Sequence, residues 1–132
     1  MTTEEILRGV CAALRAEGIE AAPRRISALD GREGCVVRPM PARVAVQYIN
    51  GDMEVEQQVR VIVKRRRAAD AMAAAEDAAC AMDGLAIAGA DGEAVLACSG
   101  DMCQELELND QDFTIWEARA TARYTKKGEP TL

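Results

Sequence analysis

Apolar and polar residues alternate most regularly between residues 43 and 64, in two runs separated by Asn50-Gly51. Such alternation predicts β-strands with one buried face. Asn-Gly favours a two-residue type I′ turn, in which both central residues take positive φ. This turn pairs Ile49 with Asp52, Tyr48 with Met53, Val46 with Val55 and Val44 with Gln57. The valines and Tyr48 then share one face, whereas the other face is mostly polar. We therefore predict a half-buried antiparallel hairpin.

Two other stretches have helical periodicity. Residues 3–16 follow Thr2, which fits a capping box with Glu5, and their apolar residues recur on one face. Residues 68–82 are crowded with alanine, and one face carries Met72, Ala75, Ala79 and Met82. Short side chains allow a helix to approach a sheet closely. Alternatively, alanine is present only because it is the best intrinsic helix former.

The remaining strands are shorter or later in the chain. Residues 35–37 predict a short strand, and residues 85–98 predict two short strands or one strand and a loop. The acidic residues 99–112 predict a surface loop or short strand, and the tail 126–132 is expected to be flexible. Residues 113–124 form a further strand, with an apolar face of Trp116, Ala118, Ala120, Ala122 and Tyr124 that can seat the alanine-rich helix.

These elements predict one α+β domain over residues 1–132, with a mostly antiparallel sheet and two main helices on one face. The far end of the long strand, residues 59–64, is expected to be completed by the C-terminal strand or by a neighbouring subunit.

Composition narrows the possible chemistry. The chain lacks histidine, and its five cysteines include no CxxC pair, so neither a metal site nor a cofactor is predicted. An enzyme is not expected, because a nucleophilic Cys80 or Cys98 has no identifiable base. No apolar run is long enough to cross a membrane, and the N-terminus has no signal-peptide layout, so secretion is not expected.

Charge points to candidate interface residues. The net charge is −6, yet Lys64, Arg65, Arg66 and Arg67 form a dense basic cluster. This cluster is a solvated strand end, a phosphate contact or a partner for a neighbour's acidic segment. The acidic candidates are Asp101, Glu105 and Glu107. Specific nucleic-acid binding is not expected, because aromatic residues that could stack on bases make up only 3% of the chain.

The order of elements resembles that of a known family. An amphipathic helix, a hairpin (VAVQYINGDMEVEQQVRVIV), the run RRR, an Ala/Met/Glu helix and the closing strand FTIWEARATARYTK follow one another between Thr3 and Lys126. This order resembles the small minor capsid or tail-terminator proteins of tailed bacteriophages and their prophage relatives. The resemblance implies a virion protein, assembled in the bacterial cytoplasm into a commonly hexameric ring. That ring caps the tail tube and faces the head connector.

Two alternatives remain open. Within phage, a head-closure or other connector protein fits the same pattern. Outside phage, a cytosolic α+β binding or adaptor module would act through a face of its sheet.

Overall fold

The computed structural model describes residues 1–98, 103–106 and 112–128. It confirms the predicted α+β class, with a mostly antiparallel sheet and helices on one face. None of the helices in this described part is long and apolar enough to span a membrane. The predicted flexibility of the tail falls largely on residues 129–132, which lie outside the described residues.

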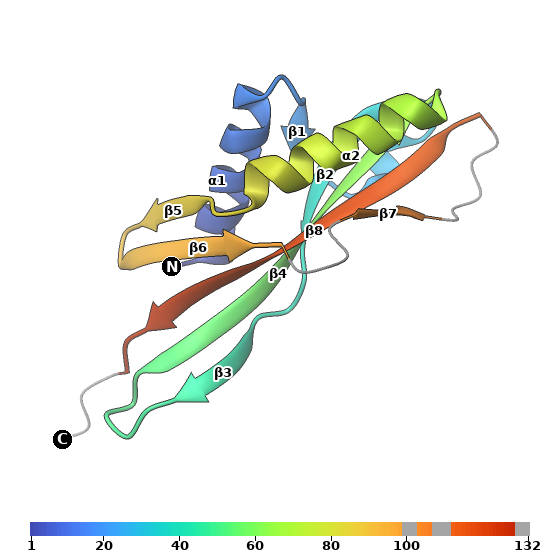
Figure 1. Ribbon diagram of the computed structural model, residues 1–132. Coiled ribbons are helices and arrows are strands. Elements are labelled where there is room, and N and C mark those ends of the chain that lie inside the picture. The colour runs from blue at the N-terminus through green and yellow to red at the C-terminus, as the bar shows by residue number, and fades with distance from the viewer. Residues whose placement is uncertain (99–102, 107–111, 129–132) are drawn as a thin grey trace.

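Two long strands form the centre of the sheet (Figure 1). β4 (Met53–Arg65) and β8 (Thr114–Lys126) pair antiparallel along their whole length. Each carries two shorter strands end to end on its outer edge: β2 and β3 on β4, and β6 and β7 on β8. The flanking strands are β1 (Ala21–Ala22), β2 (Gly34–Pro39), β3 (Arg43–Gln47), β5 (Ala86–Gly89), β6 (Gly92–Ala97) and β7 (Cys103–Leu106).

The chain itself completes the far end of β4. Residues 59–64 pair with β2 on one side and with β8 on the other. Of the two expected partners, the C-terminal strand is therefore the correct one, and β2 leaves no edge there for a neighbour.

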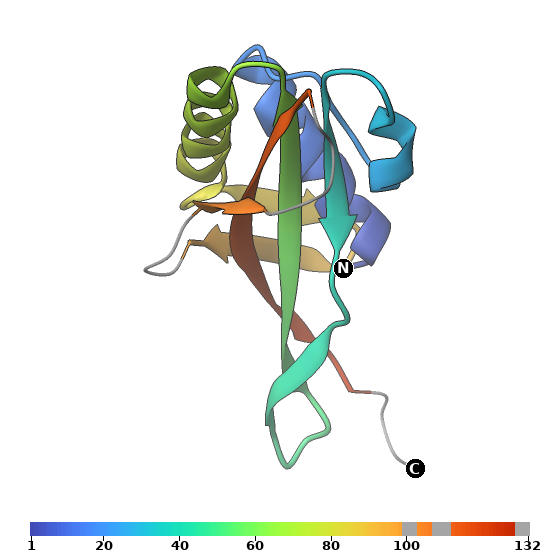
Figure 2. The same cartoon turned by 90° about the vertical axis from the view of Figure 1, so that its right-hand side faces the viewer.

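Two helices cover one face of this sheet (Figures 1 and 2). α1 (Thr3–Ala16) begins with the predicted capping box: Thr2 accepts from the Glu5 amide at 3.1 Å, and Glu5 accepts from the Thr2 amide at 2.9 Å. Thr3 also hydrogen-bonds the buried Gln57, at 3.1 Å, which fixes the start of α1 to β4.

The second helix packs against the alanine face of β8, as predicted. α2 (Ala68–Met82) buries Ala71, Ala75, Ala78, Ala79 and Met82. Ala78, Ala79 and Met82 share the main core with Ala118, Ala120 and Ala122 of β8. The predicted place of Met72 on this face is wrong, because its side chain is 41% exposed. The buried face is centred instead on Ala71, Ala75 and Ala78.

The other sheet face carries a second, smaller core that the sequence pattern did not predict. The 3-10 helix η1 (Ile26–Leu29) lies over this face, and Leu29 packs on Val36, Ile62 and Ile115. The face predicted to be mostly polar is therefore apolar at the end where η1 lies and where Leu106 of β7 packs. It is polar only farther along the ribbon.

The hairpin exists, but its predicted turn and register are wrong. Gly51 alone takes positive φ, at +90°, so the turn is not type I′. The Gly51 amide donates to the Tyr48 carbonyl at 3.0 Å, and the Tyr48 amide to the Asp52 carbonyl at 2.8 Å. These bonds define a three-residue loop with glycine at its last position.

That longer loop shifts the pairing of the two strands. Val44 pairs with Val55 and Val46 with Glu54, and an irregularity separates the two pairs. Because opposed residues share a sheet face, Val44 and Val46 point to opposite faces. The predicted shared face of Val44, Val46 and Tyr48 is therefore wrong, although Val55, Val59, Val61 and Val63 are buried as expected.

Candidate functional site

The end of the central ribbon extends away from both helices (Figures 1 and 2). We call this part the arm: β3, residues 53–57 of β4, residues 122–126 of β8, and the turn between β3 and β4. The arm is anchored to the body at Gln57, which is 4% exposed and donates to the Met40 carbonyl at 2.9 Å. Toward its tip, the arm has β3 beside β4, while β6 reaches along β8 only as far as Arg123.

The arm and the segment leading into it expose apolar side chains to solvent. Every residue of β3 is exposed. Of the seven large hydrophobic side chains that are exposed in the described residues, five come from residues 40–49: Met40, Val44, Val46, Tyr48 and Ile49. Ile49, at the tip, is fully exposed at 108%. Large apolar groups gathered on a protruding element are typical of interaction surfaces, because their exposure to water gives no stabilisation.

Two backbone edges of the arm are free within the described residues. β3 pairs with β4 only, so its outer edge has no partner strand there. β6 pairs with β8 up to Arg123, which leaves the outer edge of residues 124–126 open on the opposite side of the arm. Unpaired strand edges offer hydrogen-bond donors and acceptors to another strand.

Ion pairs fix the polar face of the arm. Arg43 of β3 and Arg123 of β8 both donate to Glu56 of β4, the Arg43 bond measuring 2.9 Å. Hydrogen bonds from Arg43 and then Arg123 hold the pKa of Glu56 below its ordinary value. All three strands of the arm are thus tied together by one carboxylate.

The C-terminal end of the described chain packs on the turn of the arm. The Gly128 amide donates to Asp52 at 2.9 Å, and a Cβ placed on Gly128 would overlap the Gly51 backbone. Only glycine permits this close approach.

The predicted basic cluster lies at the opposite end of the ribbon. Lys64 is 3% exposed: its Nζ donates to the Leu29 carbonyl at 2.8 Å and lies 4.5 Å from the centre of the Phe113 ring. Arg66 also lies over this ring, at 4.8 Å. The Lys64 ammonium is therefore engaged inside the subunit. To contact a neighbouring subunit, as predicted, Lys64 would have to give up its contacts with Leu29 and Phe113.

Of the other candidate interface residues, three lie in the described part of the chain: Arg65, Arg67 and Glu105. Arg65 donates to the carbonyls of Gly34 and Lys64, at 2.9 and 3.0 Å, so it too has contacts within the subunit. Arg67 is exposed at the N-cap of α2, and Glu105 is exposed in β7 opposite Trp116. Asp101 and Glu107 lie outside the described residues.

A buried carboxylate on the outer sheet face was missed by sequence reasoning. Glu117 lies on the face of its strand opposite the predicted apolar face, yet it is 2% exposed. Arg60 Nε donates to it at 2.8 Å, and Arg119 Nε lies 3.1 Å from its other oxygen. The burial of Glu117 between two arginines follows only from the pairing of β4 with β8, which places Arg60 directly opposite Arg119.

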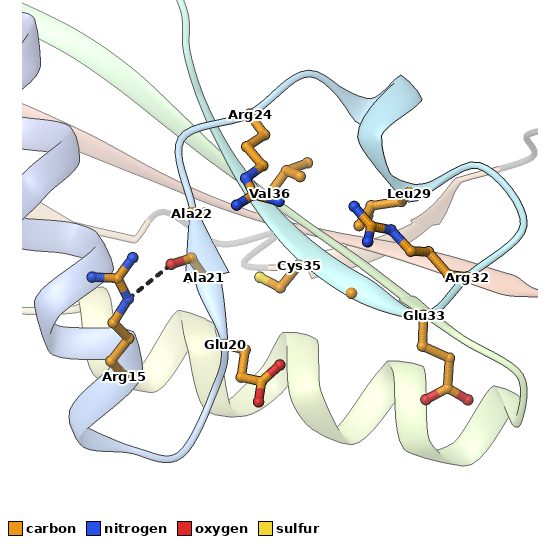
Figure 3. A pocket seen from close by; sticks show the side chains of 11 residues that line it. Arg15, Glu20, Ala21, Ala22, Arg24, Leu29, Arg32, Glu33, Cys35 and Val36 are labelled. Atoms are coloured by element: carbon orange, nitrogen blue, oxygen red, sulfur yellow. Dashed lines mark hydrogen bonds between the residues drawn. The ribbon is translucent and has the colours of Figure 1, made fainter.

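A pocket of about 330 Å³ lies between α1, β1, η1 and β2 (Figure 3). Figure 3 shows the guanidinium groups of Arg24 and Arg32 above Cys35, with Glu20 and Glu33 on the side nearer α2. Arg32 already donates to the Ala28 carbonyl at 2.8 Å. Three arginines and two glutamates line this pocket, so its charges nearly balance.

Cys35 and Cys98 lack the environment of a reactive thiol. Burial raises the pKa of the Cys35 thiol to about 12. Burial also raises the pKa of Cys98, whose Sγ donates to the Ala79 carbonyl at 3.4 Å. A raised pKa reduces the thiolate fraction, which is the nucleophilic form. Within the described residues, no group of histidine, cysteine or acidic side chains could hold a metal ion.

A scan of the chain against protein-family models finds no match, and a search of curated proteins finds none either.

Proposed function

We propose that the protein is a structural subunit that associates with copies of itself through its arm. The observation that carries this proposal is the gathering of exposed apolar side chains on a three-stranded arm with two free edges. The binding partner that fits is the arm of another subunit, because the two free edges lie on opposite sides of each arm. The β3 edge of one subunit can pair with residues 124–126 of the next.

This contact would be heterologous, since two different surfaces of the subunit meet. Heterologous contacts form rings when their rotation closes and filaments when it does not. Pairing arm to arm would continue the sheet from subunit to subunit and would shield Val44, Val46 and Tyr48 from water. Removal of apolar surface of this kind is the main driving force of association.

More specifically, we propose that the protein is a subunit of a ring in a phage particle. The order of elements that resembles the tail terminators supports a ring, commonly of six subunits, that caps the tail tube and meets the head connector. The exposed Arg66 and Arg67 stand at the end of the ribbon remote from the arm. They are available there to the acidic surface of a neighbour or connector protein.

Sedimentation of the purified protein over a dilution series tests this proposal. We expect a monomer when dilute and one dominant larger species when concentrated, with a mass that is a fixed multiple of the 14.2 kDa chain. Because apolar contacts dominate, the larger species should persist at high salt. A monomer at every concentration would contradict self-association, and a continuous range of masses would contradict a closed ring.

A second candidate function, a binding or adaptor module, is favoured by one specific observation. A cleft lined by arginines opens on the sheet face away from the helices. Such a module would remain monomeric in the dilution series and bind a foreign partner through this cleft.

A further inference from the structure

The arginine cleft has a volume of about 580 Å³ and is the larger of the two pockets beside η1. It lies on the face of the sheet that carries Glu117, between the start of η1, the end of β2, the middle of β4 and β7. Its lining residues are Arg25, Ser27, Arg38, Pro39, Met40, Arg60, Ile62 and Leu106. No acidic residue of the described chain belongs to this lining.

Three arginines reach the cleft from three different elements. Arg25 precedes η1, Arg38 lies in β2 and Arg60 lies in β4. Strand pairing places Arg38 directly opposite Arg60, and Arg60 directly opposite Arg119. Like charges in such a row repel one another, so the row is costly unless an anion lies against it.

Among the described residues, one carboxylate, Glu117, contacts this row of arginines, and two of the arginines share it. Glu117 accepts from Arg60 and pairs with Arg119, which leaves one positive charge in excess among these three groups. Within the part of the chain that the structure describes, Arg38 donates one long bond, of 3.5 Å, to the Arg24 carbonyl. Arg25 is exposed beside it. The described lining of the cleft is therefore positive, on a chain whose net charge is −6.

One of the three guanidinium groups in the cleft, that of Arg60, is held rigidly by the protein. Glu117 is 2% exposed and binds Arg60 through Nε, so the guanidinium of Arg60 is held in place before any ligand arrives. Nε and Nη2 of Arg60 are both engaged with Glu117, so Arg60 adds fixed positive charge to the cleft. The planar forks that can match the two oxygens of an incoming carboxylate are those of Arg25 and Arg38.

The uncharged part of the lining selects among anions. Ile62 and Leu106 are aliphatic, and Pro39 and Met40 complete the apolar surface. An aromatic side chain, on which a nucleobase would stack, is absent from the lining in the described residues. Guanidinium groups beside an aliphatic surface suit carboxylates that alternate with aliphatic side chains.

We infer that this cleft binds an acidic peptide segment of a partner protein, in which Glu or Asp residues flank a leucine-like side chain. The carboxylates contact Arg25 and Arg38, and the aliphatic side chain lies against Ile62 and Leu106. This inference stands on the cleft alone and does not depend on assembly through the arm. The arm itself shares no residue with the cleft lining, and Met40, in the segment that leads into the arm, borders both.

Fluorescence anisotropy with a labelled peptide of alternating Glu and Leu tests the inference. We expect saturable binding that weakens as salt rises, and no binding of the matched peptide with Lys in place of Glu. Arg25→Glu combined with Arg38→Glu should weaken binding by more than about tenfold, because two attractive charges become repulsive. The control Arg8→Glu with Arg32→Glu makes the same charge change outside the cleft and should bind like the unaltered protein.

Circular dichroism of both double variants shows that each is folded. Equal binding by the Arg25/Arg38 variant and the unaltered protein would overturn the inference. Displacement of the peptide by inorganic phosphate or ATP as readily as by unlabelled peptide would also overturn it, in favour of a small-anion site. A third result would also overturn the inference: the peptide does not bind the unaltered protein, and the Arg25/Arg38 variant no longer self-associates. The cleft would then be a contact for a second copy of this chain.

Discussion

Replacement of Ala78 by leucine should destabilise the protein by about 1–3 kcal/mol, the usual cost of forcing extra methylene groups into a packed core. Ala78 is fully buried between α2 and the alanine face of β8. Leucine and alanine are both strong helix formers, so helix propensity changes little. The loss therefore measures how closely the helix approaches the sheet. Urea unfolding followed by circular dichroism gives this value.

Ala73→Leu provides the matched control for this measurement. Ala73 lies in the same helix but is exposed, so the larger side chain extends into water. Its effect should stay within about 0.5 kcal/mol, as for most surface substitutions. Equal effects of the two substitutions would mean that the alanines of α2 serve helix propensity alone.

Replacement of Val46 and Ile49 together by lysine should abolish the larger species at concentrations where the unaltered protein is fully assembled. Both side chains are exposed on the arm, at 42% and 108%. Two charges on this surface would have to lose water when arms meet, which strongly opposes association. Val46 stands opposite Glu54, so the new lysine has a favourable neighbour within the subunit. Sedimentation velocity measures the change.

The control Met72→Lys with Ala88→Lys adds the same two charges to the body. Met72 is exposed on α2, and Ala88 is exposed on β5 opposite Glu93. This variant should assemble like the unaltered protein. Loss of assembly in the control, or full assembly of the arm variant, would place the contact elsewhere on the molecule.

Helices and long strands could be predicted from sequence because their signals are local and repeated. The Thr2–Glu5 capping box and the alanine periodicity of residues 68–82 each determine an element without reference to the rest of the chain. The alanine face of the predicted strand, residues 113–124, also indicated its partner helix. Each of these predictions is confirmed.

The turn of the arm shows why the pairing register of β3 with β4 was harder to predict than the elements themselves. Asn50-Gly51 satisfies a type I′ turn and also a three-residue loop that ends in glycine, because both place Gly51 at positive φ. The sequence does not distinguish them, and the choice shifts every pair in β3. The loop moves Val46 from Val55 to Glu54, and a separate irregularity between Val44 and Val46 then places these two residues on opposite faces. No local signal in residues 43–47 predicts that irregularity.

The candidate sites depend on pairs that are remote in the chain. Arg38, Arg60 and Arg119 form a row only once β2, β4 and β8 are in register. Glu117 has nothing in its neighbouring residues that predicts burial, since its main partner Arg60 is 57 residues away. Conversely, the sequence singled out Lys64 for its charge, whereas the fold buries it under Leu29 and Phe113.

Hydrogen exchange of the backbone amides, measured on dilute and concentrated protein, tests the central claim of assembly through the arm most directly. If arms pair edge to edge, amides of residues 43–47 and 124–126 should exchange more slowly in the concentrated sample. Amides of α2 should exchange at the same rate in both samples. A larger species that forms while the arm amides exchange as fast as in the monomer would contradict the claim.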